Sequence, residues 1–276
     1  MLLMVNKLSK NLHKILKEKC VIIRQCSVQK PYKLLFFGSD NISFTSFQKV
    51  NEFRGMVNVH PSLLPRWRGA APIIHTLLHG DEITGVTLMK IKADIFDVGE
   101  IISQCKVPVS KDIKLPELTE QLSNIGADML VQCLKTLPDS INNAYPQNNE
   151  GVTYAKKINK NISEVRWHDM TARDVYNLHR AIYGLYPLST KFRDKRLKLF
   201  DAFIHNPDEV DNNNPIGYLE YCNKTDAIRV LCKDKRYVYF KSLRIVGKRQ
   251  IEAIDFYNGY IKNMAIKDRN GLVVRN

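Results

Sequence analysis

The chain has 276 residues, of which 44% are hydrophobic and 25% charged, as in globular proteins with room for two modest domains. No apolar run approaches the roughly 18 residues of a membrane span, and the six scattered cysteines show no spacing typical of a metal site. The formal net charge of +14 makes the chain strongly basic. We therefore expect free thiols, and neither a membrane nor a metal as a partner.

The first 30 residues are basic, with seven lysine or arginine residues against the single acidic residue Glu18. Lys7 and Lys10 interrupt the continuous apolar core that a secretory signal would need. Apolar residues instead recur at helical spacing: Leu8, Leu12, Ile15 and Leu16. The pattern predicts a mitochondrial presequence over residues 1–30 and a location in the mitochondrial matrix. The alternative is a solvated basic helix that is never removed.

A strand, a helix and a second strand are predicted next. Residues 32–37 form an apolar run typical of a buried strand, and residues 38–40 a turn after it. The helix would carry three apolar side chains on one face: Phe47, Val50 and Phe53. The second strand ends at His60, so the segment can close one βαβ unit. Gly38 lacks the further glycines of a dinucleotide-binding fingerprint, so we expect no NAD site.

Residues 58–72 form the most informative stretch. Asn58 and His60 lie two residues apart, so on a strand both side chains project from one face. A loop containing Pro61 and Pro65 follows, and Pro72 then lies at the start of a helix, where a missing N–H costs nothing. Open α/β folds place their chemistry in such loops after a strand. Taken alone, however, a histidine is more often a structural residue than a catalyst.

Asp97 is the third candidate residue. It lies between two predicted strands, residues 84–91 and 100–107, which would form a hairpin that returns Asp97 towards His60. A capping or turn aspartate beside Gly99 is the alternative interpretation. A long helix over residues 115–137 should then cover one face of the sheet.

Residues 138–150 are rich in proline and small polar side chains and predict a linker. Thr171 and Asp174 resemble a capping box that opens a helix. Short strands then recur up to residue 243, and residues 251–258 predict a closing helix. Short strands at this spacing indicate a small barrel over residues 151–276.

Several of these stretches resemble the methionyl-tRNA formyltransferases. Residues 62–72, Ser-Leu-Leu-Pro-Arg-Trp-Arg-Gly-Ala-Ala-Pro, are similar to the signature loop of that family, and Asp97 falls where the family has its catalytic aspartate. Residues 153–158 and 253–259 resemble further landmarks. The resemblance implies an α/β fold, with a Rossmann-like formyltransferase domain over residues 31–137 followed by an OB-like barrel.

The resemblance also implies that the first domain is partly truncated. Family members have several more strand and helix units between the Gly-Ser-Asp turn at residue 38 and the Asn-x-His strand, where this chain has one short helix. The missing region would include part of the folate pocket. A splice variant or an incomplete gene model would explain the difference.

The chemistry that the resemblance implies is formyl transfer from 10-formyltetrahydrofolate to the amino group of initiator methionyl-tRNA. The N–H groups of Asn58 and His60 would stabilise the oxyanion. Asp97 would accept the proton of the attacking amine and hold His60 in its protonated form. The folate would contact the loop formed by Ser62, Leu63, Leu64 and Pro65.

The candidate tRNA-binding residues are basic and lie in the signature loop and in the C-terminal domain. They are Arg66, Arg68, Lys195, Arg196, Lys198, Lys235, Arg236, Lys248 and Arg249. A solvated basic surface is the alternative for all of them. We expect a monomer.

Two other functions are compatible with the sequence. A formyltransferase for a small amine would share Asn58, His60 and Asp97 but would not need the basic C-terminal domain. A catalytically impaired tRNA-binding remnant would keep that domain and lack the chemistry.

Overall fold

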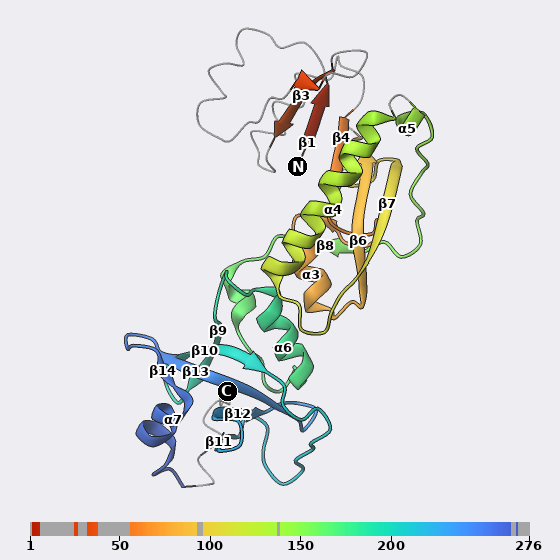
Figure 1. Ribbon diagram of the computed structural model, residues 1–276. Helices are drawn as coiled ribbons and strands as arrows, with labels where there is room; N and C mark the ends of the chain where they lie inside the picture. The colour runs from red at the N-terminus through yellow and green to blue at the C-terminus, as the bar shows by residue number, and fades with distance from the viewer. Residues whose placement is uncertain are drawn as a thin grey trace. The chain divides into compact units, whose positions relative to one another are not determined.

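The fold is described by a computed structural model, which covers residues 2–5, 25–26, 32–37, 56–92, 96–136, 139–265 and 269. The chain divides into two compact units (Figure 1). Unit 1 comprises Met1–Pro72, Glu82–Val109 and Leu118–Lys157, and unit 2 comprises Ile73–Asp81, Ser110–Glu117 and Ile158–Asn276. The mixed α/β class predicted from the sequence is confirmed.

Unit 1 is built on a six-stranded sheet with the order β2-β3-β1-β4-β6-β7. Its strands are β1 (Leu2–Val5), β2 (Gln25–Cys26), β3 (Tyr32–Phe37), β4 (Met56–His60), β6 (Ile83–Lys90) and β7 (Ile101–Pro108). Every neighbouring pair is antiparallel.

The two strands of the expected βαβ unit run in the same direction without being neighbours. Both β3 and β4 pair antiparallel with β1, which lies between them. The sequence did not predict β1, because the lysines that follow it favour a basic helix. The helix expected before β4 and most of the predicted presequence lie outside the described residues, so the presequence stays a prediction.

Among the residues that the structure describes, one helix covers the sheet of unit 1. Helix α4 (Leu115–Lys135) lies across β4 and β6 (Figure 1) and buries one apolar stripe, Leu118, Leu122, Gly126, Leu130 and Cys133. A Cβ atom at Gly126 would come within 2.6 Å of the Val59 side chain, so this glycine allows the helix to approach β4 closely. In the part of the chain that the structure describes, no helix combines the length and apolar character needed to cross a membrane.

The segment predicted as a linker contributes to unit 1. After the short helix α5 (Asp139–Asn142), Tyr145 pairs with Ile101 of β7. Strand β8 (Tyr154–Ala155) then runs parallel to β5 (Arg68–Gly69). Unit 1 therefore continues to Lys157.

Unit 2 is an antiparallel sheet with the order β11-β12-β13-β10-β9, and β14 pairs with β13. The strands are β9 (Leu188–Phe192), β10 (Lys195–Phe203), β11 (Leu219–Cys222), β12 (Ala227–Leu231), β13 (Tyr237–Ile245) and β14 (Ile251–Glu252). Among the described residues no pairing joins β9 to β11, so the sheet of the expected small barrel is not closed at these two strands.

Helices cover the core of this sheet. Helix α6 (Ala172–Ala181) begins with the predicted capping box of Thr171 and Asp174 and packs its buried face on the sheet, as does α7 (Ala253–Phe256). The predicted closing helix begins two residues late, because Ile251–Glu252 pairs with β13, and it ends in a π-helical turn, Tyr257–Ile261.

Other segments of unit 2 are held to α6 by Arg180. Its guanidinium donates hydrogen bonds to the Ser110 carbonyl, to the Leu77 carbonyl of α3 (Pro72–Leu78) and to Asn177 Oδ1, over 3.1, 3.3 and 2.9 Å. Burial lowers the pKa of Arg180. The residue is therefore a structural centre of unit 2.

Candidate active site

His60 lies at the end of β4, and its side chain is buried, with 3% of the residue exposed. Its Nε2 lies 2.9 Å from the Trp67 carbonyl oxygen. A carbonyl can only accept a hydrogen bond, so Nε2 carries a hydrogen. In the neutral ring the lone pair is then on Nδ1, which faces Asp97 Oδ1 at 3.6 Å.

The Asp97 carboxylate also accepts hydrogen bonds from Asn58 and from the backbone of Gly69. Asn58 Nδ2 donates to Asp97 Oδ1 over 3.3 Å, and the Gly69 N–H donates to Oδ2 over 2.8 Å. The hairpin of β6 and β7 brings Asp97 to this position, as expected from the sequence. The structure thus brings together the three residues predicted to be catalytic.

Burial has a larger effect on His60 than the neighbouring charge. The buried surroundings lower the pKa of His60, although Asp97 and the Trp67 carbonyl act in the opposite direction. The expectation that Asp97 keeps His60 protonated is therefore wrong, because desolvation penalises the charged ring more than the carboxylate stabilises it. At neutral pH the imidazole is neutral.

The loop after His60 is fixed by internal hydrogen bonds. Ser62 is fully buried and its hydroxyl donates to the Arg66 carbonyl over 2.6 Å. Leu64 is also buried, and the peptide bond between Leu64 and Pro65 is cis. Leu63 and Pro65 are partly exposed. Of the four residues predicted to contact folate, these two therefore have side-chain surface to offer.

Two further residues that the sequence did not single out support this loop. The Thr87 hydroxyl in β6 donates to the Ser62 carbonyl and accepts from the Leu64 N–H, over 2.7 and 3.1 Å. Gln104 in β7 donates to the Leu64 carbonyl over 2.9 Å. A threonine within a largely apolar buried strand was the one available signal for this role.

The two arginines of the loop have different surroundings. The Arg66 guanidinium lies over the Trp67 ring, 4.3 Å from its centre. Arg68 is 9% exposed, and its Nε and Nη2 donate to Gln147 Oε1 over 3.1 and 2.6 Å. The solvated surface position that was the alternative for Arg68 is therefore not what the structure gives, because the guanidinium has an internal partner.

Gln147 also contacts the Asp97 loop. Its Nε2 donates to the carbonyl oxygens of Asp97 and Gly99, over 2.9 and 2.8 Å. Gln147 lies in a polar, proline-containing stretch, and such stretches usually connect domains. The sequence therefore did not indicate that Gln147 contacts the Asp97 loop.

Comparison with known proteins identifies the family. Residues 44–134 match the family described as Formyl transferase, and residues 157–261 match Formyl transferase, C-terminal domain. The chain belongs to the formyltransferase family. Both of its units thus contain regions that match this family.

Relatives similar in sequence include the mitochondrial methionyl-tRNA formyltransferases of Mus musculus, 42% identical over 213 residues, and Homo sapiens, 41% identical over 213 residues. Each alignment covers 75% of this chain and 54% of the relative. The chain therefore spans about half the length of the curated relatives that it matches.

Solved structures support the fold assignment. HypX from Aquifex aeolicus in complex with tetrahydrofolic acid matches with a TM-score of 0.55 and 16% identity, over 79% of this chain and 37% of HypX. The N-formyltransferase from Helicobacter canadensis, in complex with folinic acid and dTDP-3-aminofucose, matches with a TM-score of 0.52 and 23% identity, over 67% of this chain and 65% of that one.

The basic residues predicted in unit 2 do not form one equivalent set. Lys195 and Arg236 are exposed, whereas Lys198 is 9% exposed and has a pKa lowered mainly by burial. Arg196 Nη2 lies 3.3 Å from Glu164 Oε2, and Lys235 Nζ donates to the Asn214 carbonyl over 2.9 Å. Burial and internal partners thus reduce what Lys198 and Lys235 can offer a ligand.

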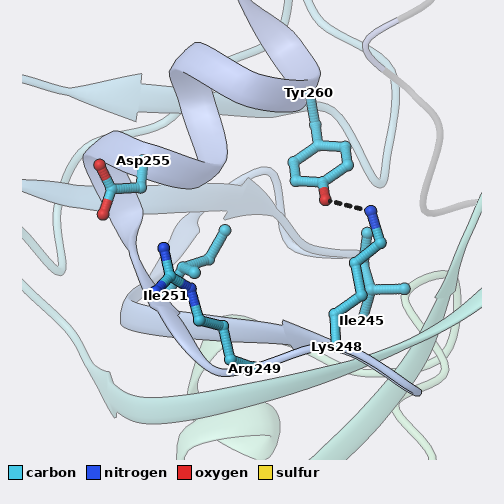
Figure 2. A pocket seen from close by; sticks show the side chains of 6 residues that line it. All are labelled: Ile245, Lys248, Arg249, Ile251, Asp255 and Tyr260. Carbon is cyan, nitrogen blue, oxygen red and sulfur yellow. Dashed lines mark hydrogen bonds between the residues drawn. The ribbon is translucent and has the colours of Figure 1, made fainter.

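Lys248 and Arg249 line a hollow of about 350 Å³. Figure 2 shows both side chains beside Tyr260 and Asp255, with Lys248 Nζ donating to the Tyr260 hydroxyl over 2.9 Å. Ile245 and Ile251 complete the lining. Two cations, the carboxylate of Asp255 and an aromatic ring line the hollow, so one positive charge is in excess there, as a phosphate with an attached base or sugar would need.

Proposed function

We propose that this protein transfers a formyl group from 10-formyltetrahydrofolate to the amino group of initiator methionyl-tRNA in mitochondria. The observation that carries the proposal is the Asp97 carboxylate, held by Asn58 and the Gly69 N–H beside the buried ring of His60. The two mitochondrial methionyl-tRNA formyltransferases described above support the choice of substrate and compartment.

The amine attacks the formyl carbon, and the formyl oxygen becomes an oxyanion that needs a hydrogen-bond donor. The His60 N–H is engaged by the Trp67 carbonyl, so Asn58 is the better donor. Its amide carries two N–H bonds, one directed at Asp97 and a second that can reach an oxyanion. This differs from the expectation that both residues donate.

The attacking nitrogen becomes positive and must lose a proton before the tetrahedral intermediate collapses. Asp97 Oδ1 and His60 Nδ1 face each other at 3.6 Å, and both can accept. If Asp97 takes the proton, its carboxylate becomes neutral. If His60 Nδ1 takes it, the imidazole becomes a hydrogen-bond donor towards the carboxylate. The pair therefore serves as the proton acceptor of the reaction. When the intermediate collapses, the bond between the formyl carbon and the folate nitrogen breaks, and tetrahydrofolate leaves with a proton on that nitrogen.

The fixed loop is suited to form one wall of the folate site. The Leu63 side chain packs over Gly85 of β6. A Cβ atom added at Gly85 would come within 2.6 Å of the leucine side chain. The partly exposed Leu63 and Pro65 offer apolar surface on a backbone that Thr87 and Gln104 already hold. A preorganised wall costs less ordering entropy when the donor binds.

The tRNA would bind through the exposed basic residues of unit 2, with Lys248 and Arg249 at their hollow as the leading candidates. Phosphate contacts release counterions, so affinity should fall steeply as salt rises. Reversing both charges with Lys248→Glu and Arg249→Glu should weaken binding and reduce the salt slope by about two.

The test uses the full chain with charged initiator tRNA and 10-formyltetrahydrofolate, and it measures formyl-methionine on the tRNA. Formylation that His60→Ala abolishes and the exposed-site control His168→Ala leaves unchanged would support the proposal. A folded chain that binds tRNA without formylating it would indicate that the protein is a catalytically impaired tRNA-binding remnant. Formylation of amino sugars but not of tRNA would instead indicate a small-amine formyltransferase.

A further inference from the structure

The carboxamide of Gln147 joins three parts of the active site. Its oxygen accepts two hydrogen bonds from Arg68, and its nitrogen donates to the carbonyls of Asp97 and Gly99. A guanidinium can only donate and a carbonyl can only accept, so these partners determine which end of the amide is which. All four bonds are within hydrogen-bonding distance, between 2.6 and 3.1 Å.

The backbone that Gln147 holds is not an ordinary loop. Asp97 has a φ of 56°, in the left-handed region that few residues other than glycine adopt. Such a conformation persists where surrounding contacts determine it. Gln147 supplies two such contacts, at the carbonyl of Asp97 itself and at that of Gly99 two residues later.

The conformation of Asp97 decides where its carboxylate points. With the backbone in the left-handed region, Oδ2 meets the Gly69 N–H and Oδ1 faces both Asn58 and His60. A relaxed backbone would turn the Cα–Cβ bond away from these partners. Displacements of about 1 Å in an active site can cost roughly 100-fold in rate.

We propose that Gln147 is a positioning residue for the reaction, which holds the Asp97 carboxylate against His60 and Asn58, with Arg68 fixing the Gln147 amide in turn. The inference rests on the proposed function for its kinetic consequence. Its geometric part, that Gln147 determines the place of Asp97 relative to His60, can be tested without turnover.

The kinetic test compares Gln147→Met and Gln147→Glu with the control Gln132→Met on the exposed face of α4. Methionine keeps the length of the side chain but makes none of the four bonds. Glutamate keeps the shape and the Arg68 contact but replaces the donating nitrogen with an oxygen that faces two carbonyls. Both variants should lower kcat by roughly 10- to 100-fold with KM for tRNA and folate little changed, whereas the control should match the parent protein.

The second measurement is the pKa of His60 by NMR, with the seven histidines labelled at Cε1 and the His60 signal assigned by its loss in His60→Gln. In the parent protein, Asp97→Asn should lower the His60 pKa, because the carboxylate raises it. In the Gln147→Met and Gln147→Glu backgrounds the same change should shift the pKa less than half as far.

An undiminished effect of Asp97→Asn in both folded Gln147 variants would overturn the inference, whatever the activity. A loss of kcat with full coupling between Asp97 and His60 would also contradict it, since Gln147 would then act elsewhere. An inactive parent protein with the expected loss of coupling would refute the proposed function alone. The glutamate variant covers the case in which the methionine variant does not fold.

Discussion

The backbone N–H of Gly69 donates a hydrogen bond to Oδ2 of Asp97 over 2.8 Å, although 28 positions separate the two residues in the chain. Gly69 belongs to β5, which pairs with β8, and has a φ of 121°. The loop after His60 and the loop before β7 therefore meet at this bond. The charge of the carboxylate makes the bond stronger than one between neutral groups.

Gly69→Ala should destabilise unit 1 by clearly more than a change at an unconstrained turn. A Cβ atom there would lie 2.7 Å from the Ala155 carbonyl oxygen, which is backbone and cannot move aside easily. Gly151→Ala is the matched control, because Gly151 also has a positive φ, of 76°, but nothing within 4 Å of its added Cβ. We expect about 1 kcal/mol for the control and at least 2 kcal/mol for Gly69.

The chain has two tryptophans, one in each unit, so urea unfolding can be followed separately. In a Trp167→Phe background, Trp67 fluorescence reports unit 1. Equal losses of stability for Gly69→Ala and Gly151→Ala would show that the contact with Ala155 does not restrict residue 69.

Asp97→Asn should lower kcat for formylation by roughly 10²- to 10⁴-fold, because the amide cannot take up the proton of the attacking amine. Asparagine adopts the left-handed region as readily as aspartate and can still accept from Gly69. The fold and the affinity for tRNA should therefore change little. Single-turnover formylation and filter binding measure the two quantities, with the exposed Asp128→Asn as control. Near-parental turnover would exclude Asp97 from the mechanism.

The local pattern of the sequence predicted the parts of the site that lie on regular elements. Asn58 and His60 share a strand, and the alternating residues on either side of Asp97 form a hairpin whose register brings it back to β4. In both cases the position of a side chain follows from strand geometry and from a connection of few residues.

The contacts that fix these residues could not be predicted in the same way. Gln147 and Thr87 act on carbonyls 50 and 25 positions away in the chain, and neither a glutamine in a polar stretch nor a buried threonine identifies its partner. The effect of burial on His60 likewise depends on what covers the ring. Whether the strands of the C-terminal barrel close on one another could not be predicted either, because a succession of short strands does not say whether the first and last of them pair or whether helices cover the core.

Arg180→Met should destabilise unit 2 by roughly 2 to 4 kcal/mol, because the carbonyls of Ser110 and Leu77 and Asn177 Oδ1 each lose a hydrogen bond from the charged guanidinium. Backbone N–H groups of Ile113 and Gly80 still donate to the two carbonyls, so the loss comes from the guanidinium contacts. Arg173→Met on the same helix is the control. Its guanidinium is exposed, 5.6 Å from the ring of Tyr176, so its loss should cost within about 0.5 kcal/mol. Urea unfolding followed by Trp167 fluorescence in a Trp67→Phe background measures both. Similar values for the two variants would mean that Arg180 does not join α6 to these segments.

His179 should make unit 2 sensitive to acid. The residue is 7% exposed, and among the described residues its Nε2 is buried without a hydrogen-bond partner. Burial, with Lys114 adding to it and Asp201 opposing it, lowers the pKa of His179 to about 4. In the unfolded chain the pKa is about 6.5.

The folded state therefore disfavours the protonated ring, and the contribution to stability is fully present above pH 6.5 and is lost as the pH falls from 6.5 to about 4. A tenfold difference in proton affinity is worth ~1.4 kcal/mol, so the loss over this window is roughly 3 kcal/mol. His179→Phe removes the titrating group and keeps a ring against Tyr176 and Tyr183, whose rings lie 6.4 and 5.5 Å away.

The measurement is the free energy of unfolding of unit 2, from Trp167 fluorescence in a Trp67→Phe background, at several values between pH 7.5 and 4. The Phe variant should lose markedly less stability over this range than its parent. The exposed His168→Phe controls for the removal of a histidine as such and should follow the parent curve. If His179→Phe also follows the parent curve, the acid sensitivity of unit 2 arises from other groups. The two proteins differ in the titratable group at residue 179, so equal curves would mean that this group has no effect.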